Sequence, residues 1–139
     1  MLPVFSRSKR NSNDLMRNFW PAAISNRPTM LYEKSLRSGQ NIDFDGNVVI
    51  LGDVNPGAEI VASGHILVMG SLRGLVHAGA TGEEGATVTA LHFAPTQLRI
   101  ASHITRPPED GNEDISNKPA ETARIKNDAV VIEKYEAPK

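Results

Sequence analysis

An apolar or small residue recurs at every sixth position between Gly46 and Ala80, and a second such row runs two positions further on. Alternation inside each six-residue unit fits a short strand with one inward side, separated from the next strand by a tight corner. Gly46 and Gly64 are three such units apart, which indicates three strands to a coil, and we call this spacing the coil repeat. The pattern predicts an all-β fold, a short parallel β-helix of triangular cross-section. The inward rows are Val48, Val54, Ile60, Ile66, Leu72 and Ala78, then Ile50, Pro56, Ala62, Val68, Gly74 and Ala80.

The same pattern predicts the limits of the β-helix. Residues 31–45 lead into it, with Tyr32 and Leu36 covering its open end, so that the coils begin at about Gln40. Residues 81–85 break the period, and the next strand resumes about four residues late, as an inserted corner loop requires. We therefore expect about three coils within a domain of residues 31–105. An acidic loop then leads to a terminal hairpin around Asn127 and Asp128, within residues 106–139, which should fold over the last coil.

The composition fits one mainly-β domain. The chain has 139 residues, with 11 glycines and 9 prolines that favour short strands and tight turns. A net charge of −1 argues against a nucleic-acid-binding protein. The absence of cysteine excludes disulfides, thiolate metal sites and cysteine nucleophiles. With no membrane-spanning stretch and no secretory signal in the sequence, we expect a soluble, cytoplasmic protein.

Residues 1–30 carry five Lys and Arg side chains against Asp14 alone. We expect a basic, poorly ordered segment, because chain termini are usually loose. The alternative is a basic anchor with an aromatic tip, built from one or two helical turns at residues 14–20 that bring Phe19 and Trp20 together.

The four histidines are the candidates for catalysis. Hexapeptide-repeat acyltransferases also use a triangular β-helix, with a histidine as general base between subunits of a trimer. Here no acid accompanies a histidine at a fixed spacing, so His65, His77, His92 and His103 are predicted to be solvated strand residues. Metal-ligand spacing and phosphate-binding loops are absent too, and no cofactor or metal is predicted. We expect no enzymatic activity, and keep the acyltransferase as the alternative.

Two surfaces are candidates for binding. Outward apolar residues of the coils would face solvent unless a partner or the hairpin covers them, and they predict a protein interface, most simply a homodimer. These residues are Val49, Leu51, Val61, Leu67 and Met69. A second, polar group near the start of the first coil comprises Arg37, Gln40, Asp53 and Asn55, for which turn and cap chemistry is an equal alternative.

The motifs RSGQ, GDVNPGAE, ASGxIxVxGxLRG and AGAxG occur in this order, and together they resemble the C-terminal domain of the bacterial cell-division inhibitor MinC. The resemblance covers about residues 29–105 and, more loosely, the tail. It implies a right-handed β-helix that dimerises through one prism face and binds the membrane-associated ATPase MinD. By resemblance, Arg37, Ser38, Gly39 and Gln40 belong to the MinD-binding surface, together with the neighbouring Asp53.

The chain departs from the MinC family pattern at two places. Family members carry an N-terminal domain that is the main inhibitor of FtsZ polymerisation, whereas only about 30 unrelated-looking residues precede the match here. The family also contacts the FtsZ tail, in some members through an arginine just after the LRG element. Leu75 follows Gly74 in this chain, which makes Arg73 the nearest candidate.

The resemblance thus predicts a non-enzymatic division inhibitor that MinD recruits to the inner face of the cell membrane, so that membrane contact is indirect. The alternatives are a self-assembling β-helix scaffold and the trimeric acyltransferase.

Overall fold

The computed structural model describes residues 25–106 and 118–138, in which it contains β-strands and no helix. The helical turns expected at residues 14–20 and the acidic stretch 107–117 lie outside the described residues. The strands, in chain order, are β1 (Thr29–Tyr32), β2 (Asn41–Phe44), β3 (Asn47–Ile50), β4 (Glu59–Ala62), β5 (Ile66–Leu72), β6 (Leu75–Ala78), β7 (Val88–Phe93), β8 (Gln97–Ile100), β9 (His103–Thr105), β10 (Glu121–Lys126) and β11 (Ala129–Lys134).

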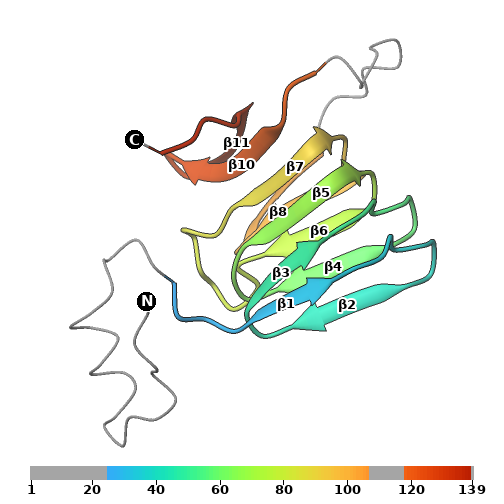
Figure 1. Cartoon of the computed structure of the whole chain (residues 1–139). Helices are drawn as coiled ribbons and strands as arrows, with labels where there is room; N and C mark the ends of the chain where they lie inside the picture. The colour runs from blue at the N-terminus through green and yellow to red at the C-terminus, as the bar shows by residue number, and fades with distance from the viewer. Residues whose placement is uncertain (1–24, 107–117, 139) are drawn as a thin grey trace, which may run out of the picture.

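The strands wind into a β-helix with three faces (Figure 1). Sheet A stacks β1, β3, β5 and β7 in parallel, and sheet B stacks β2, β4, β6 and β8 in parallel. The third face is narrow and is held by parallel bridges that join Leu36 to Val54 and Val54 to Leu72. The triangular parallel β-helix predicted from the six-residue spacing is confirmed.

The β-helix begins earlier than the sequence pattern indicated. Met30 of β1 pairs with Val48 of β3, one coil repeat further on, so that residues 29–36 already form part of a coil. Tyr32 and Leu36 are therefore members of this first coil rather than a cover for it. With four parallel strands on each of two faces, the solenoid has about four turns.

Two corners change the register of the later coils. Ile60 of β4 pairs with Val76 and not with Ala78, the partner that the regular coil repeat gives, because the corner between β5 and β6 is shorter than the equivalent corner at residues 55–58. Ile66 of β5 pairs with Val88 and not with Glu84, because residues 79–87 form a longer corner loop. This second departure confirms the late register predicted for the strand after residue 85.

The core is a single column of aliphatic side chains along the axis of the prism. Every member of the first predicted row, from Val48 to Ala78, is at most 1% exposed. The second row holds at Ile50, Ala62 and Val68 but is wrong at Pro56, which is exposed while Ala58 is buried instead. Pro56 lies in a turn at the corner, where the strand alternation does not apply.

The hairpin of β10 and β11 closes the far end of the solenoid, as predicted. Asn127 and Asp128 form its turn with φ angles of 52° and 61°. β10 pairs antiparallel with β7, and apolar side chains of the hairpin pack against the core: Ile125, Val130 and Ile132. The hairpin thereby extends sheet A instead of covering the outward side of that sheet (Figure 1).

Candidate partner-binding site

Residues 37–40 form a turn that is stacked on an equivalent turn one coil further on. Gln40 N donates to Arg37 O at 3.0 Å, and the backbone N of Ala58 donates in the same way to the carbonyl of Asn55 at 3.0 Å. The third residue of each turn, Gly39 or Gly57, has a positive φ, with values of 86° and 88°. This is the conformation that favours glycine at the third position of a type II turn.

Hydrogen bonds fix the backbone of the 37–40 turn. Gly39 N donates to Gly57 O at 3.0 Å, and Arg37 N donates to the side-chain Oε1 of Gln40 at 2.8 Å. A Cβ placed on Gly57 would lie 2.3 Å from Ser38 Oγ, so the two turns are in close contact. The side chain of Gln40 therefore serves the turn itself, and the exposed Arg37 is the residue that is left to contact a partner.

The outward side of the third face carries two columns of polar residues, which we call the polar strip. One column is Ser35, Asp53 and Ser71, and the other is Arg37, Asn55 and Arg73, with one coil repeat between successive members. Backbone bonds confirm the stacking, because Asn55 N donates to Leu36 O at 3.0 Å and Arg73 N donates to Val54 O at 2.8 Å. With strands about 4.8 Å apart, two levels separate Arg37 and Arg73 by about 10 Å.

Asp53 forms hydrogen bonds with the residues above and below it in its column of the polar strip. Its Oδ1 accepts a hydrogen bond from Ser71 N at 2.8 Å, and its own backbone N donates to Ser35 Oγ at 2.8 Å. Within the part of the chain that the structure describes, Arg37 and Arg73 form no side-chain hydrogen bond or ion pair. The strip thus presents two exposed guanidinium groups with a carboxylate between their levels.

The structure brings the predicted MinD residues and the predicted FtsZ residue onto one surface. The motifs predict different partners for Arg37 and Arg73, although the two residues are two coil repeats apart. The coil repeat was the signal that could have grouped them. The same repeat would also have found Ser35 and Ser71, which hold Asp53 in place.

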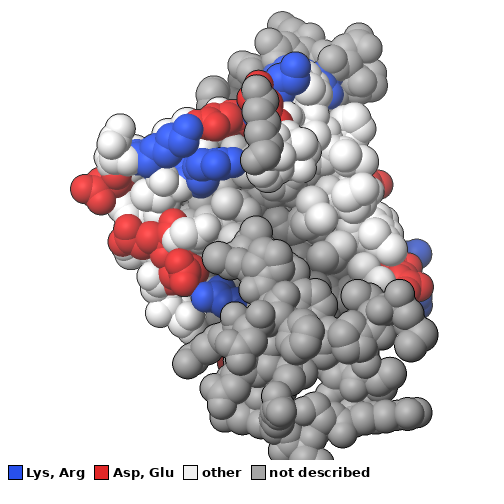
Figure 2. Space-filling model, turned by 60° about the vertical axis from the view of Figure 1, so that its left-hand side comes forward, with Lys and Arg blue, Asp and Glu red and all other residues white. Residues whose placement is uncertain are grey.

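The outward side of sheet A is apolar. Leu31, Val49 and Leu67 pair across β1, β3 and β5, and Met69 lies with Gly70 opposite Leu91 at a β-bulge. Large hydrophobic side chains on this side are strongly exposed: Leu31 (53%), Leu51 (46%), Met69 (46%) and Leu91 (41%). In Figure 2, residues other than Lys, Arg, Asp and Glu cover much of the described surface at the upper right, with charged residues at its right-hand edge.

Four of the five residues predicted for the dimer face lie along sheet A, and Val61 does not. Val61 is in β4 and pairs with Asp43 and His77 on sheet B. It comes two six-residue units after Val49, which places it two faces further around the prism. Leu67 comes three units after Val49 and therefore returns to the same face.

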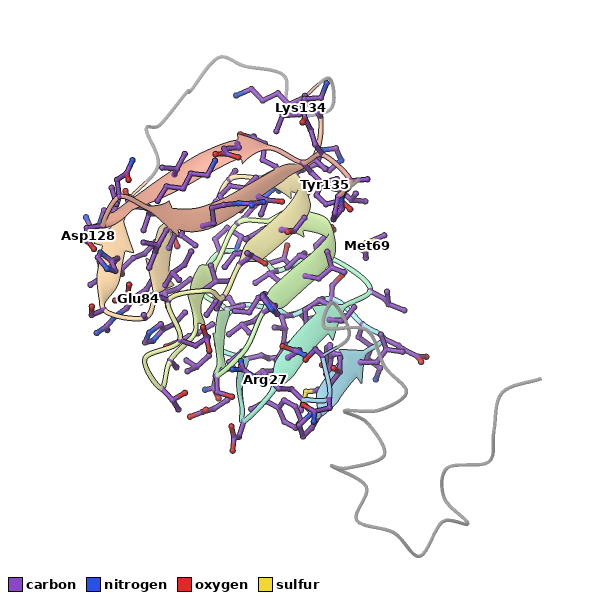
Figure 3. All side chains as sticks on the ribbon, turned by 90° about the vertical axis from the view of Figure 1, so that its left-hand side faces the viewer. Arg27, Met69, Glu84, Asp128, Lys134 and Tyr135 are labelled. Carbon is purple, nitrogen blue, oxygen red and sulfur yellow. The ribbon has the colours of Figure 1, made fainter. Side chains whose placement is uncertain are left out.

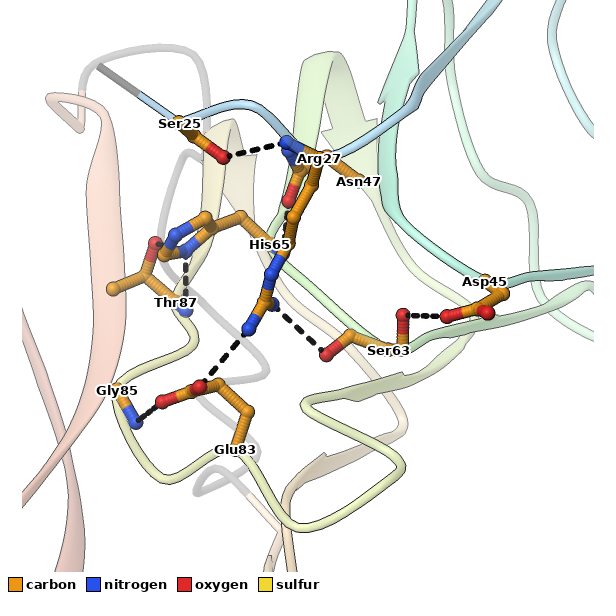
Figure 4. Close-up of polar contacts among 9 residues, drawn as sticks. All are labelled: Ser25, Arg27, Asp45, Asn47, Ser63, His65, Glu83, Gly85 and Thr87. Carbon is orange, nitrogen blue, oxygen red and sulfur yellow. Dashed lines mark hydrogen bonds and ion pairs between the residues drawn. The ribbon is translucent and has the colours of Figure 1, made fainter. Parts of the chain in front are cut away.

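A polar cluster occupies the corner between sheet B and sheet A (Figure 4). Arg27 Nη2 contacts Glu83 Oε2 at 3.0 Å, and Arg27 Nη1 donates to Ser63 O at 3.3 Å, which ties the segment before β1 to the corner loop. The backbone N of Gly85 donates to Glu83 Oε1 at 2.9 Å. This bond and the Arg27 guanidinium lower the pKa of Glu83. The cluster joins the segment before β1 to the corner loop through exposed contacts.

The imidazoles of His65 and His77 form hydrogen bonds with backbone groups. Thr87 N donates to Nδ1 of His65 at 3.0 Å, which requires that nitrogen to be unprotonated. Burial, followed by the charge of Arg27, lowers the pKa of His65 below its ordinary 6.5. His77 Nε2 lies 2.9 Å from the carbonyl oxygen of Ala101. These two imidazoles are accounted for by local structure.

Comparisons with known proteins agree with the geometry. A family model described as "Septum formation inhibitor MinC, C-terminal domain" matches residues 30–135. A probable septum site-determining protein MinC from Acetivibrio thermocellus is 49% identical over 133 residues, covering 96% of this chain and 58% of that protein. Its counterpart from Heliobacterium modesticaldum is 56% identical over 107 residues, covering 77% of this chain and 36% of that protein.

A solved structure has the same fold. A chain of the "MinC:MinD cell division protein complex" from Aquifex aeolicus superposes with a TM-score of 0.72 at 36% sequence identity, covering 80% of this chain and 89% of that one. The fold and its surfaces therefore define a β-solenoid that presents an apolar face and a polar strip. The chain belongs to the MinC family, and the region shared with the family model is the C-terminal domain.

The extent of these matches adds two facts. The chain spans about half the length of the curated relatives that it matches. The match to the Acetivibrio thermocellus protein covers 96% of the chain, so it extends into the first thirty residues, which the sequence motifs had left outside the resemblance. Among the described residues, no helix is long and apolar enough to cross a membrane.

Proposed function

We propose that this chain is the MinD-binding part of a division-site selection protein, which acts with MinD to block septum formation through FtsZ assembly. The observation that carries the proposal is the 37–40 turn, whose backbone is fixed by Gly57 and Gln40 while the guanidinium of Arg37 stays exposed. An arginine on a rigid turn loses little conformational freedom on binding, and arginine is enriched among the residues that dominate interfaces. The solved relative in a MinC:MinD complex supports this choice of partner.

Co-sedimentation with MinD, ATP and lipid vesicles tests the proposal. Wild-type chain should pellet only when MinD and ATP are present, and Arg37→Ala should reduce its affinity about tenfold or more, as for a central interface arginine. Arg99→Ala is the matched control, because Arg99 is an exposed arginine on sheet B. If Arg37→Ala pellets like wild type, the site is wrong. If wild type itself stays in the supernatant, the partner is wrong.

Dimerisation through sheet A is the second part of the proposal. The outward apolar residues on β1, β3, β5 and β7 are exposed because the hairpin extends the sheet and leaves this side open. Light scattering should give twice the chain mass of 15.1 kDa. Met69→Glu should shift the mass to that of a monomer, whereas Ile104→Glu, at an equally exposed apolar residue on β9, should not. A trimer would favour the acyltransferase, and filaments without MinD would favour the scaffold.

The contact with FtsZ is proposed at Arg73. Because Arg73 shares the polar strip with Arg37, MinD bound at Arg37 would restrict access to Arg73 on the same protomer. FtsZ sedimentation with and without MinD, using wild type and Arg73→Ala, measures this contact. Inhibition by Arg73→Ala equal to that of wild type would remove Arg73 from the proposal. We place the protein in the cytoplasm, at the membrane only through MinD, and assign it no enzymatic role.

A further inference from the structure

Three side chains from separate segments converge beside the capping hairpin. Glu84 lies in the corner loop, His103 begins β9, and Asp128 lies in the turn between β10 and β11. One ligand atom from each lies within 4.8 Å of those from the other two, and His103 Nε2 is 3.9 Å from Glu84 Oε1. Figure 3 shows Glu84 and Asp128 on the same side of the molecule, away from Met69 and Tyr135. Sequence spacing could not predict this group, because only the fold brings the three segments together.

We propose that Glu84, His103 and Asp128 bind one divalent transition-metal ion, for which Zn²⁺ is the best match. An imidazole with two carboxylates is a mixed nitrogen and oxygen ligand set, which suits Zn²⁺, whereas Ca²⁺ and Mg²⁺ prefer oxygen ligands alone. Three protein ligands leave a fourth position for water, as in open zinc sites.

The local charge favours a cation at this position. Two carboxylates held within 4.8 Å of each other repel unless a positive charge lies between them. Within residues 25–106 and 118–138, neither Glu84 nor Asp128 forms an ion pair with a lysine or arginine. By contrast, the neighbouring Glu83 is paired with Arg27. Of the two acidic residues in the corner loop, Glu83 is therefore paired with an arginine, whereas Glu84 is paired only with His103.

Only small movements are needed to form the site. Zn²⁺ lies about 2.1 Å from nitrogen and oxygen ligands, so tetrahedral ligands are about 3.4 Å from one another. The present spacing of at most 4.8 Å therefore has to shrink by only about 1.4 Å. Glu84 and Asp128 are exposed, and their side chains can rotate by this amount without disturbing the core.

Bound Zn²⁺ would clamp the end of the solenoid. The corner loop at residues 79–87 is the longest departure from the regular coil. The hairpin pairs with the β-helix through β10, and apolar side chains of both its strands pack against the core. The ion would connect this loop to β9 and to the hairpin turn. A ligand that binds only the folded chain raises its stability, and here the gain should be concentrated in the hairpin.

Tag-free wild-type chain, equilibrated with Zn²⁺ and then dialysed, tests the proposal by its metal content. We expect about one Zn²⁺ per chain and weaker retention of Ca²⁺ or Mg²⁺. His103→Gln and Asp128→Asn should each weaken Zn²⁺ binding at least about tenfold, in line with the sensitivity of metal sites to altered ligation. His92→Gln and Asp43→Asn are controls that remove an imidazole or a carboxylate elsewhere, and they should bind Zn²⁺ like wild type.

Thermal unfolding in EDTA and in Zn²⁺ separates ligation from folding. All five proteins should unfold cooperatively in EDTA, and Zn²⁺ should raise the midpoint of wild type and of the controls by more than that of the two ligand variants. Amide exchange in β10 and β11 should slow with Zn²⁺ in wild type. A wild-type chain that retains no Zn²⁺, or ligand variants that retain as much as wild type, would overturn the proposal.

Discussion

Replacing Gly57 with alanine should disturb the candidate site without changing any residue in it. Gly57 and Gly39 occupy the same position in stacked turns, with φ angles of 88° and 86°. Alanine in this left-handed region lowers the free energy of unfolding by about 1–2 kcal/mol, whereas the smaller conformational entropy of the unfolded alanine variant raises it by about 0.4–1 kcal/mol. A Cβ on Gly39 would meet nothing within 4 Å, so Gly39→Ala should lower the free energy of unfolding by about 1 kcal/mol.

The cost at Gly57 should be larger because Ser38 is in the way. A Cβ at Gly57 would lie 2.3 Å from Ser38 Oγ and 3.0 Å from Ser38 Cβ. The hydroxyl can rotate away, but the contact with Cβ remains, and such overpacking costs about 1–3 kcal/mol. Gly57→Ala should therefore be about 1–3 kcal/mol less stable than Gly39→Ala, or lower in unfolding midpoint by about 4–12 °C for a domain of this size.

Urea unfolding of the two single variants measures this difference, and a double variant tests its cause. In a Ser38→Gly background, where both close atoms are gone, Gly57→Ala should cost no more than Gly39→Ala does in wild type. Equal costs for the two single variants would show that the turns are not packed as described. Gly57→Ala should also weaken co-sedimentation with MinD, because it displaces the turn that carries Arg37.

Three further predictions concern the core and the polar corner. Leu72→Ala should lower the free energy of unfolding by about 2–5 kcal/mol in urea titrations, because Leu72 is fully buried at the third face. Because the pKa of His65 in the folded chain is below 6.5, the unfolded chain binds a proton on this imidazole at a higher pH than the folded chain does, and stability should fall as pH drops from about 6.5 through the lower folded value. Calorimetry across this pH range should show this fall in wild type. The fall should be smaller in His65→Gln, whose side chain cannot be protonated beside Thr87 N. Glu83→Gln should leave the unfolding midpoint at physiological salt nearly unchanged, because its ion pair with Arg27 is exposed, and a large decrease would contradict this view of the corner.

The sequence predicts the repeating part of this fold well because equivalent positions in successive coils have the same environment and therefore require the same kind of side chain. Val54 and Leu72 must be apolar since both are fully buried in the core, and the coil repeat reflects this requirement. The lengths of the corners are less predictable, because they depend on how closely the backbones of neighbouring coils approach each other. Gly74 permits the short corner, since a Cβ there would lie 2.5 Å from the carbonyl oxygen of Ala58, and a six-residue count cannot detect this.

The candidate site was predictable only in part. The RSGQ resemblance located Arg37, but the relation between Arg37 and Arg73 follows from the stacking of coils, which the motif does not encode. Val61 lies on sheet B, apart from the other four outward apolar residues, because outward direction alone does not identify a face, whereas distance along the coil repeat does. The group formed by Glu84, His103 and Asp128 depends on where the hairpin turn lies against β9 and the corner loop, and the spacing of these residues in the sequence does not encode that position.

Amide chemical-shift mapping with ATP-bound MinD shows directly which residues bind the partner. We propose that the rigid 37–40 turn and the polar strip beside it bind MinD. On addition of MinD and ATP, the largest perturbations should fall at residues 37–40, with smaller ones at Asp53 and Arg73, and the amides of sheet B should stay unchanged. Perturbations confined to sheet B, or an unperturbed turn at saturating MinD, would contradict the account.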